Sequence, residues 1–536
     1  MSRRPKILEG ERRRALAVLV TLSFGQAGAM VATAFATRDV FVFLRERGEA
    51  MPVGALAVIA ASGLALFACR ALEGRVGERA GQSYAAAIRR TLFLHVSRMP
   101  VSAVARRRSG ALALRYVGDL AAFKGWIARG LSRLISAAVT IPAALVVLYL
   151  LEPWLLVAAI GPLGAVMAGI LLLSSSLGEA HSDLRSRRAR LAAAMAERLP
   201  QGIQLRRSGR LRTELRALKG WSGDVAEAGV RRESLSATVR ALPDAGAGLA
   251  GALCLGTCMH LGLGIPEAVA ALTALTLIVW PLRQLADVAD RRRAFLVASA
   301  KLDRLLQTPR MPATRIEAGT QDAPAIELEA AGLPGGGRID LILQRGECRR
   351  LAGPSGSGKS ALLLALAGFD RRVEARRFAV LGQTPEALAP GEVLYLGRQA
   401  PGLAGSLRRE VTLGIGRMPD DTEIEAAVES AGLGPMVSRI SGLGGKISEG
   451  RRNLTASEQA GLLLARALLA RPKLALVDAD EIGLGRQALG RLLDHLASVG
   501  AASLVVTSDA EAILRLGPPV LLHAPKPRAS SVSSDS

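Results

Sequence analysis

A glycine-rich octapeptide in the second half of the chain has the residue types and spacing of a phosphate-binding loop. It fits the pattern G-x-x-x-x-G-K-[ST] at every fixed position. The glycines let the backbone curl so that successive N–H groups point at phosphate oxygens. In this pattern the lysine reaches the outer phosphates of a nucleotide and the last hydroxyl holds Mg²⁺. We therefore predict a site for ATP and Mg²⁺ made by Gly353, Pro354, Ser355, Gly356, Ser357, Gly358, Lys359 and Ser360.

The residues around this loop predict the elements that would position it. Apolar residues, Leu351 and Ala352, stand directly before it, and an apolar run of helical character follows at 361–367. A strand end, a tight turn and a helix start are the context that the motif needs. The helix would also direct the positive end of its dipole at the phosphates. A glycine- and serine-rich loop that contains a lysine by chance is the weaker interpretation, because it does not explain this context.

The composition indicates a membrane protein. The chain has 536 residues, of which 50% are hydrophobic and only 3% aromatic, and its mean hydropathy is +0.29. The net charge of +23 fits either nucleic-acid binding or the excess of basic residues that membrane proteins keep on their cytoplasmic side. Because the arginines cluster between apolar runs, the second explanation is favoured, and we expect no nucleic-acid partner.

The four cysteines do not form a disulfide pattern. They are scattered, mostly in apolar surroundings, at positions 69, 254, 258 and 348. Cys254, Cys258 and His260 are close enough in sequence to resemble metal ligands. They lie in or at the end of a membrane run, however, so that ordinary helix packing is the favoured interpretation and a metal site the alternative.

Six apolar runs, each near the roughly 20 residues that a bilayer core requires, are predicted to be membrane helices. Two long arginine-rich connections separate the second run from the third and the fourth from the fifth, and the other three connections are short. Buried helices of a large soluble domain would not produce this regular spacing. The runs lie near residues 15–37, 52–69, 134–151, 154–177, 245–263 and 265–282.

The distribution of arginine predicts the orientation of these helices. Arginines fill the N-terminal segment and both long connections. The positive-inside rule therefore places the N-terminus, both connections and everything after the sixth helix in the cytoplasm. We expect a multi-pass protein in a lipid bilayer, and the cytoplasmic membrane of a bacterium would suit this layout.

After the sixth run the chain becomes polar and changes character. Helical spacing continues through Leu306, prolines at 309 and 312 break it, and a polar linker follows. Strand-like and helix-like runs then alternate with glycine-rich turns, as in an α/β domain. We predict a transmembrane domain at 1–310, a linker at 311–324, a nucleotide-binding domain at 325–523 and a disordered tail at 524–536.

This organisation resembles that of an ATP-binding-cassette (ABC) exporter half-transporter, and the resemblance covers nearly the whole chain. It implies a six-helix transmembrane domain followed by a cytoplasmic α/β P-loop domain. It also implies that the two long connections reach the nucleotide-binding domain through coupling helices, here near 101–119 and 199–219.

The motifs of the family can be carried over one at a time. The loop at 353–360 matches the Walker A motif. Gln399 stands where the family's Q-loop glutamine contacts Mg²⁺, and Asp478 ends an apolar run as the Walker B aspartate does. The resemblance therefore implies that Ser360, Gln399 and Asp478 hold the metal.

Several positions depart from the family's pattern. The signature L-S-G-G-Q reads Leu454-Thr455-Ala456-Ser457-Glu458. Thr455 keeps a hydroxyl, but Glu458 places a carboxylate where the family binds phosphate from the opposite subunit. Thr455-x-x-Glu458 is also a capping-box pattern, which would satisfy the start of the helix internally. We favour the plain cap over phosphate recognition.

The hydrolytic positions are also altered. Ala479 occupies the position of the catalytic glutamate, so no intact catalytic set is present, and the family's switch histidine is Ser508. Asp480 and Glu481 are close by, and substitution by one of them remains open, although neither is in register to replace the glutamate directly. The D-loop aspartate is Gly485, and no adenine-stacking aromatic residue is evident around 332–337. Loss of a general base commonly costs about 10²–10⁴ in rate.

The resemblance therefore implies a subunit that binds ATP but hydrolyses it weakly or not at all at its own site. We expect an exporter that pairs with a second half-transporter, as the degenerate-site half of a heterodimer, although a homodimer is possible. The alternative is an ATP-binding regulatory membrane protein that transports nothing. The membrane helices carry few charges, which suits a lipid-like, hydrophobic or peptide substrate, and nothing in the sequence identifies it further.

Overall fold

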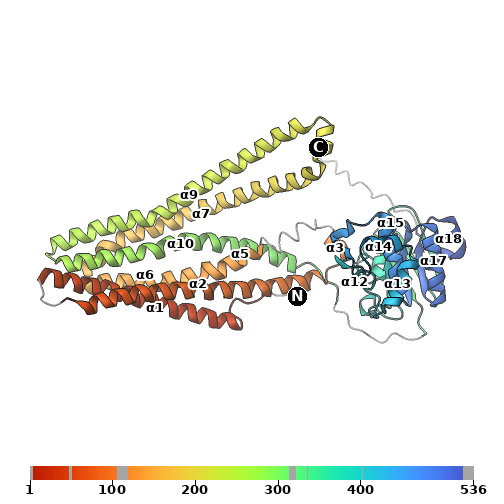
Figure 1. The fold of residues 1–536 in the computed structure, drawn as a ribbon, viewed down its shortest axis with the longest axis horizontal. Helices are drawn as coiled ribbons and strands as arrows, with labels where there is room; N and C mark the ends of the chain where they lie inside the picture. Colours follow the sequence, from red (N-terminus) through yellow and green to blue (C-terminus); the bar gives the residue numbers. More distant parts are fainter. Residues whose placement is uncertain are drawn as a thin grey trace, which may run out of the picture. The chain divides into compact units, whose positions relative to one another are not determined.

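The computed structural model describes residues 4–46, 51–105, 119–312, 322–334, 336–400 and 402–522. The chain forms two compact units (Figure 1). The first contains residues 1–95 and 108–308, and the second contains residues 96–107 and 309–536. The predicted tail, most of the predicted linker and residues 106–118 of the predicted first coupling connection lie outside the described residues.

The first unit is helical. Among its described residues, six helices or continuous helical segments are long and apolar enough to cross a membrane, which agrees with the six predicted runs. The third crossing joins α5 to α6 through a π-helical stretch at Trp126–Leu131. The helices are α1 (Glu11–Glu46), α2 (Val53–Val96), α5 (Leu120–Gly125), α6 (Ser132–Leu151), α7 (Pro153–Arg198), α8 (Gly202–Arg207), α9 (Leu211–His260) and α10 (Ile265–Leu306).

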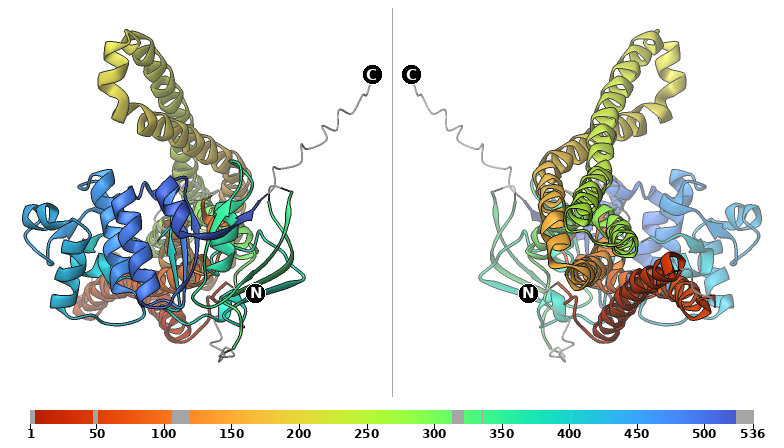
Figure 2. Two further views of the ribbon diagram at one scale, coloured as in Figure 1. Left: turned by 90° about the vertical axis from the view of Figure 1, so that its right-hand side faces the viewer. Right: turned by 90° about the vertical axis from the view of Figure 1, so that its left-hand side faces the viewer.

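The long basic connections are largely helical extensions of the membrane spans. Helix α7 has 46 residues and α9 has 50. At 1.5 Å per residue each helix is about 70 Å long, more than twice the roughly 30 Å of a bilayer core. The two helices lie side by side and are joined by the short helix α8 (Figures 1 and 2). The sequence located these basic stretches but did not resolve them as continuous helices.

Buried polar side chains connect three helices of this unit. The amide of Gln26 on α1 donates a 2.7 Å hydrogen bond to Glu73 on α2. The hydroxyl of Ser136 on α6 donates to the Gln26 side-chain oxygen at 3.3 Å. All three residues are buried. Because a polar group buried among apolar helices is costly unless it is paired, this network favours one arrangement of α1, α2 and α6.

The second unit is an α/β fold, which confirms the predicted alternation of strands and helices. Strands β10, β3, β9, β8 and β5 form a five-stranded parallel sheet in that order. A three-stranded antiparallel sheet has the order β2-β1-β4, and β6 pairs with β7. The strands are β1 (Ile326–Gly332), β2 (Arg338–Leu343), β3 (Cys348–Ala352), β4 (Arg377–Val380), β5 (Val393–Leu396), β6 (Gly405–Ser406), β7 (Lys446–Ile447), β8 (Leu474–Asp478), β9 (Ala502–Val506) and β10 (Gly517–Leu521).

The central strands of the parallel sheet are apolar because the sheet is covered on both faces. Every residue of β8 and β9 is buried, as expected for parallel strands packed between helices. The helices of this unit include α11 (Lys359–Leu366), α12 (Leu407–Val411), α13 (Asp421–Ser430), α14 (Gly434–Arg439), α15 (Ala456–Leu469), α16 (Ala479–Ile482), α17 (Arg486–Ser498) and α18 (Ala510–Arg515).

One short helix from the first long connection packs on this α/β unit. Helix α3 (Val101–Ala105) begins where the backbone N–H of Val101 donates to the carbonyl of Phe369 at 2.9 Å. The hydroxyl of Ser102 donates to the carboxylate of Asp370, also at 2.9 Å. The start of the predicted first coupling connection therefore contacts the nucleotide-binding unit directly.

A buried carboxylate holds α12 against α15. Glu410 is fully buried and accepts a 2.8 Å hydrogen bond from the guanidinium of Arg451. Arg466, also buried, donates to the Glu410 backbone carbonyl at 2.6 Å and to its carboxylate at 3.4 Å. Breaking a buried pair is costly because it leaves an uncompensated charge.

We predict that Glu410→Gln destabilises the chain by about 3–5 kcal/mol, because two guanidinium groups lose their buried counter-charge. The measurement is the thermal unfolding midpoint of the detergent-purified chain. The matched control is Glu425→Gln on α13, which is exposed and should change stability by less than about 0.5 kcal/mol. Equal midpoints for the two variants would show that the Glu410 cluster contributes no stability.

Candidate functional site

The parallel sheet brings the predicted site residues to one edge. The carboxyl ends of parallel strands meet at the same edge of a sheet, which is where α/β folds bind ligands. The phosphate loop follows β3, Gln399 lies three residues after β5, and Asp478 ends β8. Ser508 lies two residues after β9. Segments more than 100 residues apart in sequence therefore contribute to one region.

The phosphate loop has the backbone shape that its glycines permit. Gly356 and Gly358 have φ angles of 82° and 100°, in the region that favours glycine. Helix α11 begins directly afterwards at Lys359. The Lys359 ammonium donates to the carbonyls of Gly353 and Pro354 at 2.7 and 2.9 Å. The lysine is thus held over its own loop, at the N-terminus of a helix.

The residues present fit a nucleotide phosphate with its Mg²⁺. The hydroxyl of Ser360 donates to the Asp478 carboxylate at 2.7 Å, so that the two predicted metal-binding groups are adjacent. Ser357, in the same loop, is 1% exposed, and its hydroxyl has no hydrogen-bond partner among the described residues. A buried hydroxyl without a partner is unusual and suggests that a ligand supplies one.

The residue at the position of the family's catalytic glutamate is buried. Ala479 is 2% exposed and is the first residue of α16. Its methyl group cannot accept a proton, and it lies in the hydrophobic core of the α/β unit. The structure therefore puts no proton acceptor at this position.

The two neighbouring acidic residues face different groups. Asp480 accepts hydrogen bonds from the backbone N–H and the hydroxyl of Ser508 at 3.0 and 3.1 Å. Glu481 accepts from the backbone N–H of Arg398 at 3.4 Å, next to Gln399. The sequence left open whether either residue substitutes for the missing base, and the structure gives the two residues different partners.

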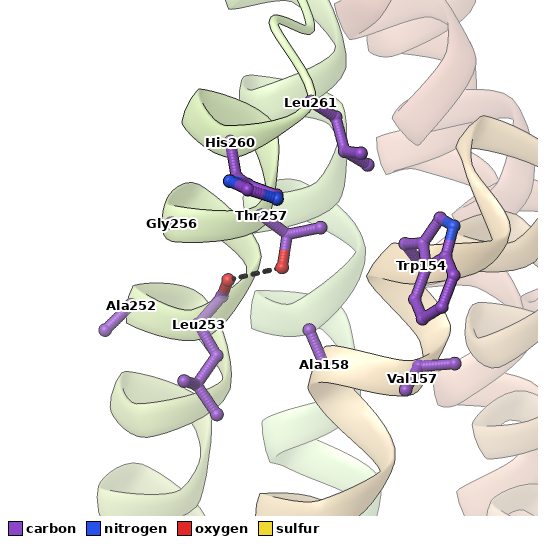
Figure 3. A pocket seen from close by; sticks show the side chains of 9 residues that line it. All are labelled: Trp154, Val157, Ala158, Ala252, Leu253, Gly256, Thr257, His260 and Leu261. Carbon is purple, nitrogen blue, oxygen red and sulfur yellow. Dashed lines mark hydrogen bonds between the residues drawn. The ribbon is translucent and has the colours of Figure 1, made fainter.

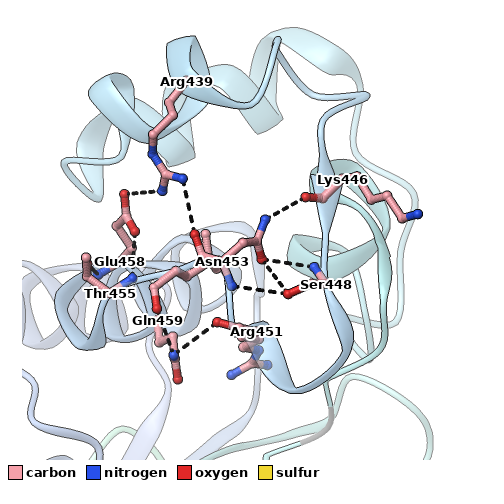
Figure 4. A network of polar contacts seen from close by, with 9 residues as sticks. Arg439, Lys446, Ser448, Arg451, Asn453, Thr455, Glu458 and Gln459 are labelled. Carbon is pink, nitrogen blue, oxygen red and sulfur yellow. Dashed lines mark hydrogen bonds and ion pairs between the residues drawn. The ribbon is translucent and has the colours of Figure 1, made fainter. Parts of the chain in front are cut away.

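The altered signature helix is capped by its own side chains (Figure 4). The Thr455 hydroxyl accepts from the Glu458 N–H at 3.2 Å, and the Glu458 carboxylate accepts from the Thr455 N–H at 2.7 Å. This confirms the predicted capping box. The Thr455 N–H and then the Arg439 guanidinium lower the pKa of Glu458 below its ordinary value. The carboxylate is therefore charged at neutral pH.

Two residues that the sequence analysis did not identify complete this arrangement. Arg439 donates to the Glu458 carboxylate at 2.7 Å and to the Asn453 carbonyl at 3.1 Å. The Asn453 amide in turn donates to the Lys446 carbonyl at 2.8 Å (Figure 4). Arg439 lies 19 residues before Glu458, and no local pattern links positions so far apart.

A groove in the helical unit lies between α7 and α9 (Figure 3). It has a volume of about 650 Å³, and its lining includes Trp154, Thr257 and His260. Cys254 and Cys258 are buried among the apolar residues of the helix core, whereas His260 is exposed. These three residues, which resembled metal ligands in sequence, therefore have different environments. This placement favours ordinary helix packing for the cysteines.

Comparison with protein families matches both units. The model of the ABC transporter transmembrane region matches residues 9–203. The family model described as "ABC transporter" matches residues 337–480. The second match includes the phosphate loop, Gln399, the altered signature and Asp478.

Known proteins are similar to one or both units. The mycobactin import ATP-binding/permease protein IrtB of Mycolicibacterium thermoresistibile is 30% identical over 230 residues, which are 40% of this chain and 39% of that protein. The thiamine import ATP-binding protein ThiQ of Cereibacter sphaeroides is 33% identical over 211 residues. That alignment covers 36% of this chain and 87% of ThiQ. The chain thus spans about two fifths of the first relative and most of the second.

A solved structure has the same fold. It is a bacterial Atm1-family ABC exporter with ATP bound, and the TM-score is 0.79 at 17% sequence identity. The alignment covers 96% of this chain and 94% of that one. The likeness confirms the predicted fold class, a six-helix membrane domain followed by an α/β nucleotide-binding domain.

We predict that Thr455→Ala lowers stability by about 1 kcal/mol, because the N–H of Glu458 loses its capping partner. The measurement is the thermal unfolding midpoint of the detergent-purified chain. Thr422→Ala is the control: Thr422 is exposed on α13, where alanine has the higher helix propensity. If both variants unfold at the wild-type midpoint, the capping box does not stabilise α15.

Proposed function

Because the chain belongs to the ABC transporter family, we propose that it is an ATP-binding subunit of an exporter. It is a multi-pass integral membrane protein with the domains of a half-transporter. In this proposal it pairs with a second ABC chain, and closure of the two nucleotide-binding domains drives export through the membrane helices. The connections that carry α3 and α8 transmit the motion.

The assembled phosphate loop is the observation that carries this proposal. The ammonium of Lys359 lies over the loop, bonded to the carbonyls of Gly353 and Pro354, and in this proposal it reaches the outer phosphates once a nucleotide is bound, with the loop N–H groups directed at the phosphate oxygens. The adjacent oxygens of Ser360 and Asp478 are suited to Mg²⁺, and Gln399 is the third metal-binding residue of the proposal. When bound, Mg²⁺ neutralises charge on the β- and γ-phosphates.

The chain is proposed to be the degenerate half of a heterodimer. Buried Ala479 leaves the proton acceptor missing, and Ser508 is hydrogen-bonded to Asp480 instead of supplying an imidazole. The carboxylate of Glu458 lies at the start of the signature helix, where it would repel an approaching phosphate. A second subunit with a catalytic glutamate and a switch histidine would supply what this chain lacks. The altered signature makes the partner's site unusual as well.

The direction of transport differs between the proteins that this chain resembles. The structural neighbour is named an exporter, whereas the sequence relative IrtB is named an importer of mycobactin. We propose export of a lipid-like, hydrophobic or peptide substrate from the cytoplasmic side, in a bacterial cytoplasmic membrane. The basic extensions of the helices support this orientation through the positive-inside rule.

Lys359→Ala is expected to weaken ATP binding strongly, because the bound phosphates lose the lysine ammonium. Hydrogen bonds to charged groups contribute about 1.5–3 kcal/mol, or roughly 10- to 150-fold in affinity. The measurement is equilibrium binding of ATP to the detergent-purified chain. Lys446→Ala, which changes an exposed lysine on β7, is the matched control and should bind as wild type. Unchanged affinity in Lys359→Ala would refute the role of the loop.

ATP turnover by the purified chain alone should not exceed that of Lys359→Ala, because position 479 supplies no general base. The loss of such a base costs about 10²–10⁴ in rate. Phosphate release from the two detergent-purified proteins tests this expectation. Turnover clearly above the Lys359→Ala background would mean that a homodimer is catalytically competent, and the heterodimer proposal would fail.

The eroded hydrolytic positions favour one alternative, a regulatory membrane protein that binds ATP and transports nothing. An exporter moves a substrate across the membrane, whereas the regulatory protein moves none. ATP-dependent movement of hydrophobic dyes or peptides by vesicles that contain the chain with its co-purified ABC partner supports the exporter. ATP binding by the same vesicles without any movement of dyes or peptides supports the regulatory membrane protein.

A further inference from the structure

Two side chains meet where helices α2 and α10 reach the predicted boundary of the membrane. The predicted apolar run of α2 ends at residue 69, directly before Arg70, and that of α10 ends at residue 282, shortly after Trp280. The guanidinium carbon of Arg70 lies 4.2 Å from the centre of the Trp280 ring, whose plane it faces. The ends of the two runs are therefore at one level, as expected for the second and sixth crossings, which run in the same direction.

The guanidinium of Arg70 is oriented but incompletely hydrogen-bonded. A cation over the face of a tryptophan is attracted by the ring, and this contact restricts the position of the guanidinium. The Nε–H of Arg70 is buried, and among the described residues it has no hydrogen-bond partner. A buried donor without a partner is costly, so that this position favours an acceptor supplied from outside the chain.

The carboxylates that could pair with Arg70 are engaged elsewhere. Glu73 follows Arg70 by three residues on α2, a spacing at which opposite charges commonly pair. Its carboxylate instead accepts from the amide of Gln26 on α1 at 2.7 Å. On α10, Asp287 pairs with Arg133 of α6, also at 2.7 Å. Arg70 therefore keeps a positive charge that no ion pair within the described part of the chain neutralises.

A second unmet group lies one turn further along α10. Gln284 follows Trp280 by four residues, so that the two side chains share a helix face. The side-chain oxygen of Gln284 is buried, and within the described ranges it accepts no hydrogen bond. Arg70 thus lacks an acceptor and Gln284 lacks a donor. A phosphate ester that also carries a hydroxyl group would supply both.

The side of Arg70 that faces the membrane is apolar and exposed. Phe67 precedes Arg70 by three residues on α2, Leu64 precedes Phe67 by three, and both are exposed. Trp280 is also partly exposed, and tryptophan is enriched at the level of the lipid headgroups. A lipid could therefore place its acyl chains against α2 while its headgroup reaches Arg70.

We propose that Arg70, Trp280 and Gln284 form a site for an anionic phospholipid with a phosphoglycerol headgroup. Arg70 donates to the phosphate, Trp280 positions the guanidinium, and a glycerol hydroxyl donates to Gln284. Basic pockets between membrane helices commonly bind anionic headgroups in this way. The bound headgroup joins α2 to α10, and its site lies in the helical unit and does not depend on nucleotide binding.

The site is tested by the binding of fluorescently labelled phosphatidylglycerol to the full detergent-purified chain, with phosphatidylcholine of the same labelled acyl chain for comparison. Wild type should bind phosphatidylglycerol about 5-fold or more tightly, the contribution of one arginine near an anionic headgroup. Arg70→Gln should abolish this preference. Gln284→Leu should reduce it, while its affinity for labelled phosphatidic acid, which has the phosphate but no glycerol headgroup, should equal that of wild type.

Arg75→Gln is the matched control, because Arg75 is an exposed arginine five residues further along the same helix. Its preference for phosphatidylglycerol should be that of wild type. The thermal unfolding midpoint without added lipid, measured for each variant, checks that a lost preference does not come from unfolding.

Equal affinity of wild type for the two lipids, or an equal loss in Arg70→Gln and Arg75→Gln, overturns the site. An unchanged preference in Gln284→Leu also overturns it, because the headgroup then does not reach α10. Displacement of the labelled lipid by millimolar glycerol 3-phosphate would mean that the site binds a soluble phosphate ester, which contradicts the assignment to a lipid.

Discussion

The nucleotide site depends on the parallel pairing of β3, β9, β8 and β5. Because these strands run in one direction, the segments that follow them must leave the sheet at the same edge. That constraint brings the phosphate loop, Gln399, Asp478 and Ser508 into one region. The chemistry-bearing residues accordingly lie at or after the strand ends, while every residue of β8 and β9 is buried. A change of register between β3, β9 and β8 would separate Ser360 from Asp478, and their hydrogen bond would be lost.

Two helices of this unit differ in what lies at their positively polarised N-termini. Helix α11 begins at Lys359, directly after two glycines with positive φ, Gly356 and Gly358, and such a helix start attracts anions. Helix α15 begins at a capping box, and the carboxylate of Glu458 already occupies its start. Arg439 neutralises part of that charge. The first helix start is suited to bind phosphate, whereas the second supplies its own anion. This contrast supports a subunit that receives nucleotide but completes a partner's site poorly.

Prediction from sequence succeeded where the signal is local or periodic. Glycine spacing predicted the loop at 353–360, the Thr455-x-x-Glu458 pattern predicted the cap, and runs of apolar residues predicted six spans. The helical structure of the basic connections was harder to predict. Helix extensions such as the second half of α7 are polar and lack the apolar periodicity of a buried face. The contact of Ser102 with Asp370 was also beyond a residue-level prediction, since 268 residues separate them.

The sequence by itself determined which chemical groups are present: a phosphate loop with its lysine, a Walker B aspartate, an alanine at position 479 and six apolar segments of bilayer length. Those properties depend on residue identity and on spacing along the chain. Only the tertiary structure decided how the groups are paired. It directed Asp480 to Ser508 and Glu481 to the backbone N–H of Arg398, and it brought Arg439 to Glu458. The reason is physical: the direction in which a side chain points depends on packing between distant segments, and residues adjacent in sequence can face different partners.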